Sequence, residues 1–418
     1  MSRIVVATWG SLGDLHPMLA VGLGLSERGH DVAIAAPDKY KEKIEQLGLG
    51  FYAIRPRLPE DPNVIARCMD PKKGASVVLK EIVLGHVRET YADLLAAVSE
   101  ADYLVAHEIV YAAPLVAEKL SLRWASCALA PAAFFSAYEP IVNSAYPALA
   151  KVHGLGVSVN RLAVRLVKRV TRPWGKPLYA LRKELGLPPV GNPIVGSEKY
   201  SPHLVLALFS KVLGRSQPDW PSNLVMTGFT FYDGDLAQPI PPALEDFLNA
   251  GEAPVVFTLG SAAVKAAGDF YANSLQAAMR LNCRAVLLGG QAALAEELPS
   301  SVFVCDYAPY SKIFPRARVI VHQGGVGTTA QALRAGRPTL VVPHTLDQPD
   351  NAARVERLGV SLTLPRERYS TEAVVTAVGQ LIGEPRYAER AAEVGRSLQA
   401  ENGVAVACDA LERVLDNL

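Results

Sequence analysis

Between residues 306 and 351 the chain brings together residues suited to a diphosphate at one end and sugar hydroxyls at the other. A short apolar strand ends on His322, a glycine-rich turn follows, and Thr328 then opens a helix. Free backbone N–H groups and the positive end of the helix dipole attract anions at such a turn. His322 and Thr328 would each donate a further hydrogen bond to a phosphate oxygen. The segment is therefore predicted to bind a diphosphate.

Residues within and before the turn extend this predicted site. The turn contains Gly324, Gly325 and Gly327. Upstream, the ring of Tyr307 offers a face on which a base would stack, and the backbone of Ala308 offers hydrogen bonds to the base edge. Each residue also has a structural interpretation, namely close packing for the glycines and a core position for Tyr307. Their occurrence together in this order favours the binding interpretation.

Downstream, a second apolar strand is followed by Asp347 and Gln348, whose side chains suit sugar hydroxyls. Asp347 has an alternative role as the N-cap of a helix that contains Asn351. The pattern is not a P-loop, because no Gly-Lys-Ser/Thr follows the glycines. It is not the dinucleotide fingerprint either, since it lies late in the chain and lacks the acidic ribose-binding residue.

Composition restricts the class of protein. A chain of 418 residues suggests two or three domains. Its net charge of only +1 argues against nucleic acid as a partner. The five cysteines are scattered without metal-ligand spacing, which favours reduced thiols and no bound metal. The N-terminus does not resemble a signal peptide, and no apolar run is long enough to cross a membrane. We expect a cytoplasmic protein with at most peripheral membrane contact.

The order of expected elements predicts an α/β fold with two doubly wound parallel sheets. Strands expected at 4–8, 32–36, 103–106 and 124–127 belong to the first series. A helix is expected from about Leu15 to Arg28. A proline-rich stretch then precedes a second series, with strands at 254–259, 284–288, 302–305, 319–321 and 339–342. The predicted division is 1–215 for the first domain, 216–242 for a linker with a short strand at 224–226, 243–390 for the second domain, and 391–418 for a C-terminal helix that packs back toward the first domain.

A basic helical region lies in the less regular stretch before the linker. Several cations fall on one helix face, while Leu162, Leu166 and Val170 fall on another. Two interpretations stay open: a helix that lies on a membrane surface, or a solvated helix that packs over a cleft.

The segment from Tyr307 to Gln348 resembles the donor-binding signature of family 1 glycosyltransferases, which have the GT-B fold of two Rossmann-like domains facing a cleft. The matching elements are an aromatic-x-Pro at Tyr307, His-x-Gly at His322, Gly-x-Pro at Gly336, and Asp-Gln at Asp347. The bacterial rhamnosyltransferases and the macrolide and flavonoid glycosyltransferases are most similar in appearance.

The resemblance implies donor roles for these residues. Tyr307 would stack on the base, and Asp347 with Gln348 would hold the sugar. Ser261, after the first strand of the second series, would contact the phosphates. Gln331 stands where many members that use uridine donors carry a ribose-binding Glu, which leaves room for a deoxyribose donor.

The resemblance also implies an acceptor half. Asp14, in the turn Gly-Ser-Leu-Gly-Asp, would be the general base for the acceptor hydroxyl, or would cap the helix that follows it. His107 would assist Asp14 or line the acceptor pocket, and His16 is a weaker candidate for the base. Aromatic side chains would line an apolar acceptor pocket: Phe134, Phe135, Tyr138 and Tyr146.

The implied function is inverting transfer of a hexose from a uridine or thymidine diphosphate sugar to a hydroxyl of a hydrophobic small molecule. The acceptor would be phenolic, flavonoid, macrolide or lipid. No metal or other cofactor is expected, and the protein would be a monomer or homodimer. Two alternatives stay open: a non-catalytic protein that binds nucleotide sugars or assists an enzyme, and a GT-B sugar-nucleotide epimerase.

Overall fold

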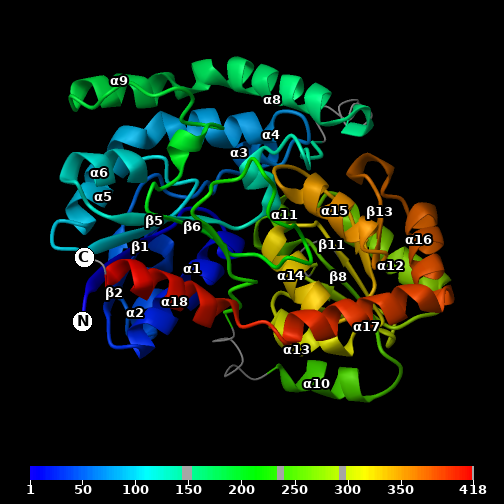
Figure 1. Ribbon diagram of the computed structural model, residues 1–418. Coiled ribbons are helices and arrows are strands. Elements are labelled where there is room, and N and C mark those ends of the chain that lie inside the picture. Colours follow the sequence, from blue (N-terminus) through cyan, green and yellow to red (C-terminus); the bar gives the residue numbers. More distant parts are fainter. Residues whose placement is uncertain (144–152, 233–239, 291–297, 417–418) are drawn as a thin grey trace. The chain divides into compact units, whose positions relative to one another are not determined.

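The chain folds into two compact units, shown by a computed structural model that describes residues 1–143, 153–232, 240–290 and 298–416 (Figure 1). The first unit comprises Met1–Glu60, Lys72–Tyr232 and Asn402–Leu418, and the second comprises Asp61–Pro71 and Asp233–Glu401.

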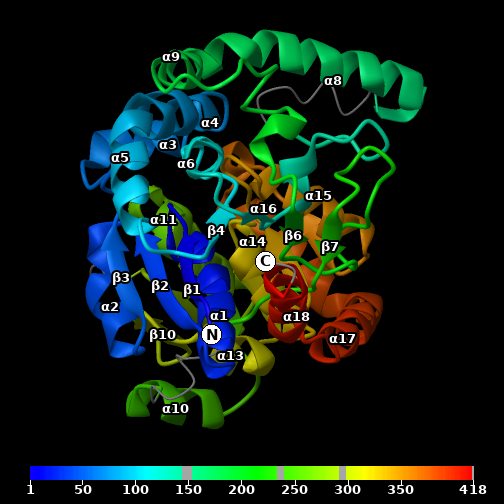
Figure 2. The ribbon, with the colours of Figure 1, turned by 60° about the vertical axis from the view of Figure 1, so that its left-hand side comes forward.

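The first unit contains a seven-stranded sheet in the order β3-β2-β1-β4-β5-β6-β7, in which every neighbouring pair is parallel (Figure 2). Its strands are β1 (Arg3–Ala7), β2 (Asp31–Ala36), β3 (Gly50–Ala53), β4 (Tyr103–His107), β5 (Trp124–Ala128), β6 (Leu204–Ala207) and β7 (Leu224–Met226). The helices around it are α1 (Leu12–Glu27), α2 (Lys41–Gln46), α4 (Gly74–Ser76), α5 (Val87–Ala97), α6 (Ala113–Leu120), α8 (Val157–Thr171), α9 (Lys176–Glu184) and α18 (Gly403–Leu415).

The second unit contains a six-stranded parallel sheet in the order β10-β9-β8-β11-β12-β13. Its strands are β8 (Val255–Thr258), β9 (Ala285–Leu288), β10 (Val302–Cys305), β11 (Val319–His322), β12 (Thr339–Val341) and β13 (Ser361–Thr363). Its helices are α3 (Pro62–Cys68), α10 (Pro242–Asn249), α11 (Gly260–Ala263), α12 (Phe270–Arg280), α13 (Tyr310–Ile313), α14 (Val326–Arg334), α15 (Gln348–Arg357), α16 (Thr371–Gly383) and α17 (Pro385–Gln399).

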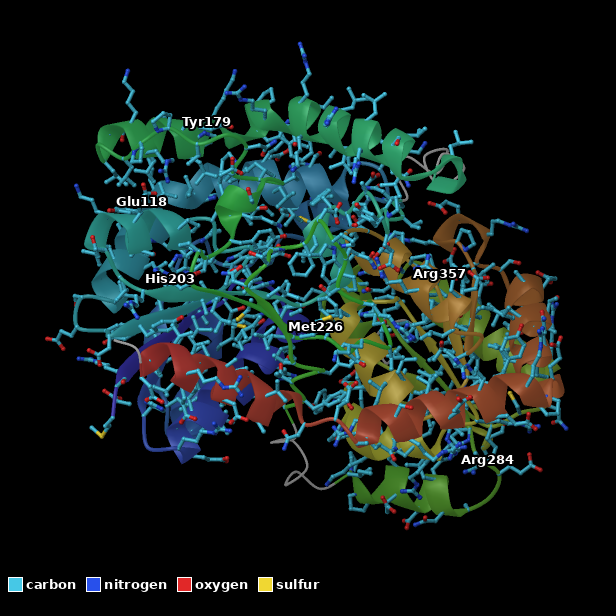
Figure 3. All side chains as sticks on the ribbon, in the orientation of Figure 1. Glu118, Tyr179, His203, Met226, Arg284 and Arg357 are labelled. Carbon is cyan, nitrogen blue, oxygen red and sulfur yellow. The ribbon has the colours of Figure 1, made fainter. Side chains whose placement is uncertain are left out.

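The central strands are mostly apolar, as expected where helices cover both faces of a sheet. In β8, β9 and β11 every residue is buried. Arg284, just before β9, donates hydrogen bonds to backbone carbonyls at the end of α10 and beyond it, including that of Glu252 at 2.7 Å (Figure 3). Because β8, β11 and β12 pair in parallel, their carboxyl ends lie at one edge of the sheet, where ligands of open α/β sheets bind.

The structure confirms the predicted α/β fold with two series of strands. One helix boundary, the start of α1, differs from the prediction and matters for the site. The first helix begins at Leu12 and not near Leu15, because Ser11 caps it. Three strands, β3, β6 and β13, are not predicted from the sequence; each is only three or four residues long.

The units divide the chain differently from the predicted domain ranges. Strand β7 lies inside the predicted linker, and its last residue, Met226, pairs with Ala207 of β6 (Figure 3). The stretch Asp61–Pro71 belongs to the second unit although it lies far upstream in the chain. The predicted start of the C-terminal element at 391 falls within α17, and only the residues after Glu401 join the first unit.

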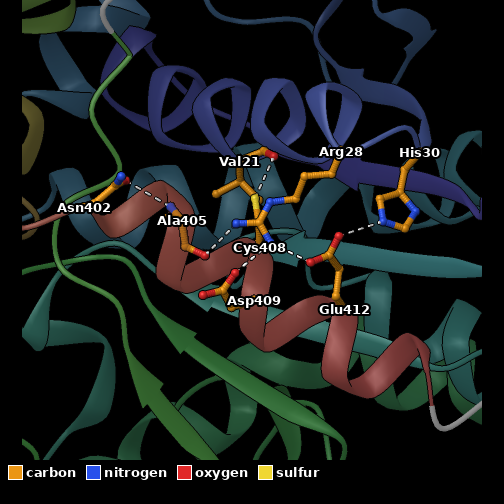
Figure 4. A network of polar contacts seen from close by, with 8 residues as sticks. All are labelled: Val21, Arg28, His30, Asn402, Ala405, Cys408, Asp409 and Glu412. Carbon is orange, nitrogen blue, oxygen red and sulfur yellow. Dashed lines mark hydrogen bonds and ion pairs between the residues drawn. The ribbon is translucent and has the colours of Figure 1, made fainter.

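Helix α18 packs against α1 through a polar network (Figure 4). The Arg28 guanidinium donates to the Asp409 carboxylate at 2.7 Å and to the Ala405 carbonyl at 3.2 Å. Beside these contacts, the Cys408 thiol lies 3.8 Å from the carbonyl oxygen of Val21. The pairing ties the end of the chain to the first helix of the same unit. Among the described residues, no helix is long and apolar enough to cross a membrane.

This close approach makes Gly24 a sensitive position. A Cβ on Gly24 would lie 2.6 Å from Val404 Cγ1 and 2.9 Å from Cys408 Sγ. We expect Gly24→Ala to lower the free energy of unfolding by about 1–3 kcal/mol, as in other overpacked contacts. Gly379→Ala in α16 is the matched control, because its Cβ would meet only Leu281 at 3.6 Å. The free energy of unfolding of that variant should rise by about 0.5–1 kcal/mol, because alanine has the higher helix propensity. If urea titrations showed the same loss of stability in both variants, close packing at Gly24 would not be the cause.

Candidate functional site

His322 ends β11 and is fully buried in the second unit. Its Nδ1 accepts a hydrogen bond from the backbone N–H of Gly324 at 3.1 Å, and burial lowers the pKa of the ring to about 3. The imidazole is therefore neutral at physiological pH and carries its proton on Nε2.

This Nε2–H group is buried and has no hydrogen-bond partner within the part of the chain that the structure describes. An unpaired buried donor is unfavourable, and native structures keep few of them. A ligand oxygen would complete the hydrogen bonding of His322, so the group suits a phosphate oxygen.

The turn after His322 keeps the backbone close to the neighbouring loop. Gly324 has a φ of +86°, and a Cβ there would lie 2.7 Å from Val341 Cγ1. Gly325 is the N-cap of α14 and makes no side-chain cap, so the first amides of the helix, including that of Gly327, have no intrahelical partner. N–H groups and a helix dipole in this arrangement favour an anion; binding of a diphosphate here stays a prediction.

Thr328, in the first turn of α14, belongs to a buried hydroxyl network. Its Oγ1 accepts from the amide of Gln323 at 3.3 Å. Nearby, Thr258 Oγ1 lies 2.8 Å from the Tyr310 hydroxyl and accepts from the backbone N–H of Gly260 at 3.3 Å. A hydrogen bond between the Tyr310 and Thr328 side chains joins these contacts, so the network links the end of β8 to the first turn of α14.

Asp347 and Gln348 stand at the start of α15. Asp347 is the N-cap residue, but its carboxylate accepts from the Asn351 side chain at 2.6 Å and makes no side-chain cap to its own helix. Asn351 also donates to the carbonyl of Gly324 at 2.9 Å. Gln348 Oε1 accepts from the backbone of His344 at 2.8 Å, which leaves the amide nitrogen of Gln348 as the group suited to a sugar hydroxyl.

Burial raises the pKa of Asp347 to about 6, against the pull of the hydrogen bond from Asn351. The folded state therefore binds this proton more tightly than the unfolded state, whose carboxyl has a pKa of about 3.9. The resulting stability is present at low pH and is lost as pH rises through about 6. A role of Asp347 in binding a sugar stays a prediction.

Asp347→Asn should remove this penalty and keep an acceptor for Asn351. We expect the free energy of unfolding of the variant to exceed that of the wild type by about 2–3 kcal/mol at pH 8 and to be close to it near pH 4, a difference that calorimetric melting would measure. Asp269→Asn, at an exposed aspartate before α12, is the control and should change the free energy of unfolding by less than about 0.5 kcal/mol. If Asp347→Asn changed the free energy of unfolding equally at pH 4 and pH 8, burial of the Asp347 carboxylate would not be destabilising the wild type.

The other predicted donor residues lie around this edge with different exposure. Tyr307 is 50% exposed, as a ring available for stacking must be, whereas Ala308 is buried. Ser261 is exposed in α11, directly after β8. Gln331 is half-buried on α14, one turn after Thr328. Their contacts with a nucleotide remain predictions.

In the first unit, Asp14 lies in the first turn of α1. Its Oδ2 accepts from the backbone N–H of Ser11 at 2.7 Å and from the Ser11 hydroxyl at 3.2 Å. Ser11 is the N-cap, so Asp14 completes a capping box from the N3 position. Gly10 has a φ of +134°, and a Cβ there would lie 2.3 Å from Asp14 Oδ2. The predicted N-cap role of Asp14 is therefore wrong, because Ser11 occupies the N-cap and Asp14 caps the helix from N3. Its role as base stays a prediction.

His107 ends β4, next to the strand that precedes Asp14. It is buried, and burial together with the nearby Lys199 charge lowers the pKa of its ring to about 3. Its Nδ1 lies 3.5 Å from the Thr8 hydroxyl, which donates to the backbone carbonyl of Asp14 at 3.1 Å. His107 is therefore neutral and is connected to Asp14 through Thr8. Direct assistance of Asp14 by His107 stays a prediction.

His16 contacts side chains of its own unit. Its Nε2 lies 3.1 Å from the Lys43 ammonium, and its ring lies 4.9 Å from that of Tyr232. The ammonium is a donor only, so in this contact His16 Nε2 is the acceptor. This contact disfavours His16 as the base.

The aromatic residues predicted to bind the acceptor differ in their surroundings. Phe134 is buried and stacks on Trp220 at 4.4 Å, with Tyr200 at 5.4 Å on the same ring. Phe135 is half-buried with a φ of +31°, and the exposed Tyr138 accepts from Arg161 at 2.7 Å. Tyr146 lies outside the described residues.

Gln323, Tyr310 and Thr258 are not predicted from the sequence as site residues, and Asn351 is predicted only as part of a helix. The four-residue spacing of Asp347 and Asn351 on one helix face is a signal for their pairing. Thr258 and Tyr310 carry no comparable signal, since 51 residues separate them and only the fold brings them together. In the described ranges, no group of three or more His, Cys, Asp or Glu side chains is placed to hold a metal ion.

Comparison with known proteins decides the family. Residues 4–126 match the glycosyltransferase family 28 N-terminal domain, and residues 274–410 match the erythromycin biosynthesis protein CIII-like C-terminal domain. The chain is 32% identical to the O-mycaminosyltylonolide 6-deoxyallosyltransferase of Streptomyces fradiae, over 98% of this chain and 97% of that protein. The chain belongs to this glycosyltransferase family.

Other relatives of the glycosyltransferase agree with this assignment. The vancomycin aglycone glucosyltransferase of Amycolatopsis orientalis is 27% identical over 97% of this chain and 96% of that protein. The crystal structure of the glycotransferase of kitacinnamycin superposes with a TM-score of 0.71 at 23% identity, covering 99% of this chain and 98% of that one. The spinosyn rhamnosyltransferase also has a TM-score of 0.71, at 19% identity and full coverage of both chains (100% of each). These structures confirm the predicted GT-B fold.

Proposed function

We propose that this glycosyltransferase moves a hexose or deoxyhexose from a thymidine diphosphate sugar to a hydroxyl of a hydrophobic small molecule, with inversion at the anomeric carbon. The observation that carries the donor assignment is the buried, neutral His322, whose Nε2–H group has no partner among the described residues. It lies beside the start of α14, where backbone amides favour an anion.

In the proposed reaction, Asp14 accepts the proton of the acceptor hydroxyl while the oxygen attacks the anomeric carbon. The bond from that carbon to the diphosphate breaks, and negative charge develops on the departing diphosphate. The Nε2–H of His322, the Thr328 hydroxyl and the first amides of α14 stabilise this charge. Because these neutral donors supply the stabilisation, we propose that the step needs no metal ion.

Asp347 and Gln348 are proposed to hold the sugar hydroxyls, with Tyr307 against the base. Two features support thymidine over uridine. Gln331 replaces the carboxylate that would bind both ribose hydroxyls most strongly. In addition, solved relatives with the same fold include the spinosyn rhamnosyltransferase complexed with thymidine diphosphate and the glycosyltransferase VinC in complex with the same nucleotide.

Similar proteins favour sugar transfer over the two alternatives, a non-catalytic protein that binds nucleotide sugars and a sugar-nucleotide epimerase. Relatives named for transfer to antibiotic aglycones or to sterols match over almost the entire chain. A macrolide, a glycopeptide aglycone or a sterol shares a large apolar body with few hydroxyls. We infer that the acceptor of this protein belongs to that chemical class.

A thermal-shift comparison of thymidine and uridine diphosphate tests the donor assignment. Ligand at about 100 times its Kd should stabilise the native state by about 2.7 kcal/mol. We expect a rise in melting temperature with thymidine diphosphate and a smaller one with uridine diphosphate. A Gln331→Glu variant should narrow or reverse this preference. No shift with either nucleotide would contradict the proposal, whereas a larger shift with uridine diphosphate would overturn only the choice of base.

A further inference from the structure

Helix α8 carries a row of large apolar side chains that point away from its own unit. Val159, Leu162, Leu166 and Val170 recur at spacings of three or four residues and so share one face of the helix. Their exposed fractions are 37%, 65%, 59% and 59%. The chain ahead of the helix continues the row, since Leu155 is 66% exposed. We call these residues the α8 stripe.

The opposite face of α8 accounts for its attachment to the first unit. Asn160 is buried there, and Val164, Val167 and Thr171 are half-buried. Asn192 reaches this face and donates to the carbonyl of Lys168 at 2.6 Å. Because packing already occupies the inner face, the stripe is not the side by which α8 is held. Both ribbon views show α8 at the outer rim of its unit (Figures 1 and 2).

Cations occupy a separate exposed face of α8 beside the stripe, and acidic residues are absent from this part of the sequence. No Asp or Glu occurs from residue 153 to residue 183. The exposed cations of α8 and the turn after it are Arg161, Arg165, Lys168, Arg169, Arg172 and Lys176. The whole chain has a net charge of only +1, so this surface is a local excess of positive charge.

We propose that α8 is a docking helix for an anionic lipid bilayer, with the α8 stripe in the interfacial layer and the cations against lipid phosphates. A helix with one apolar face and one basic face lies in the plane of such an interface. Each Lys or Arg near an anionic leaflet adds attraction that falls off within a Debye length.

A second copy of this chain fits the same surface poorly. A symmetric dimer through the stripe would bring the cations of one α8 against those of the other. Like charges at close range are repulsive, and the sequence supplies no acidic residue on the helix to offset them. A bilayer that carries negative headgroups satisfies both the apolar and the charged part of the surface.

Co-sedimentation of the full chain with lipid vesicles tests the proposal. The two probes are vesicles of phosphatidylcholine alone and vesicles in which part of that lipid is replaced by phosphatidylglycerol. The wild type should bind the anionic vesicles more tightly and lose binding as salt rises. Leu162→Gln with Leu166→Gln should lower the partition coefficient at least about tenfold. Met279→Gln, at a residue on α12 that is 49% exposed, is the control and should bind like the wild type.

The charged part is tested separately. Arg165→Gln with Arg169→Gln should abolish the preference for anionic vesicles, while Lys211→Gln with Lys265→Gln, an equal loss of charge elsewhere, should keep it.

Melting temperatures check that all variants fold. If the glutamine pair at Leu162 and Leu166 does not fold, Leu162→Ala with Leu166→Ala replaces it. No binding by the wild type, or unchanged binding by the stripe variants, would overturn the proposal. So would a dimer in solution that the stripe variants dissociate without any vesicle binding.

Discussion

Replacing His322 by alanine should lower kcat/KM by at least about a hundredfold, the usual loss when one donor to a developing oxyanion is removed. The physical reason is the orientation of the ring. Gly324 donates to Nδ1 and thereby fixes the proton on Nε2, the atom that has no partner among the described residues. Steady-state kinetics with the preferred nucleotide sugar, together with the melting temperature, measure the effect.

Two further variants separate the donor from the bulk of the ring. The amide nitrogen of glutamine reaches the place of Nε2, whereas the amide of asparagine reaches only the place of Nδ1. His322→Gln should therefore keep most of the wild-type kcat/KM, while His322→Asn should have a kcat/KM as low as that of His322→Ala. Full activity in the folded alanine variant would remove His322 from the donor site, and equal losses in all three variants would show that shape alone matters.

Asp14→Asn should lower kcat by about 10²–10⁴, as expected when a general base is lost. The amide cannot accept the acceptor's proton at neutral pH, but its oxygen still accepts a hydrogen bond from the Ser11 backbone. The folded state should therefore be nearly as stable as that of the wild type. Binding of the nucleoside diphosphate should not change, because the proposed donor residues belong to the second unit.

Ser11→Ala is the matched control for this variant. It removes the N-cap side chain and should cost about 1 kcal/mol of stability, yet it leaves the Asp14 carboxylate in place. We expect a lower melting temperature with kcat within a factor of a few of the wild type. If Asp14→Asn instead lost stability and kept kcat, Asp14 would be a helix cap and nothing more.

The fold and the donor segment are predictable from sequence because their signals are local. The apolar run of β11, the glycines after His322 and the first turn of α14 follow one another within a dozen residues. The carboxyl end of a parallel strand then determines which way they face. The elements that the sequence analysis does not predict have weak local signals, such as β13 with three residues.

Other features depend on residues that are far apart in sequence. The Thr258–Tyr310 contact joins the end of β8 to the start of α13. The burial of Phe134 depends on rings up to 86 residues away, such as that of Trp220. The exposure of Leu162 and Leu166 also follows from tertiary packing, because the sequence shows an apolar face but not which face packs inward. The exact ends of helices are also hard to predict from local sequence. Because α1 begins at Leu12 and not at Leu15, Asp14 lies at N3 and not at the N-cap.

Nitrogen-15 NMR of histidine-labelled protein tests the central claim most directly, by following His322 as thymidine diphosphate is added. The structure predicts a neutral ring with its proton on Nε2 throughout the range from about pH 6 to pH 8. It further predicts that the Nε2–H signal moves on addition of the nucleotide and that this signal is absent from His322→Gln. A ring protonated on Nδ1, or an unmoved Nε2–H signal while the nucleotide binds, would contradict the donor site described for this glycosyltransferase.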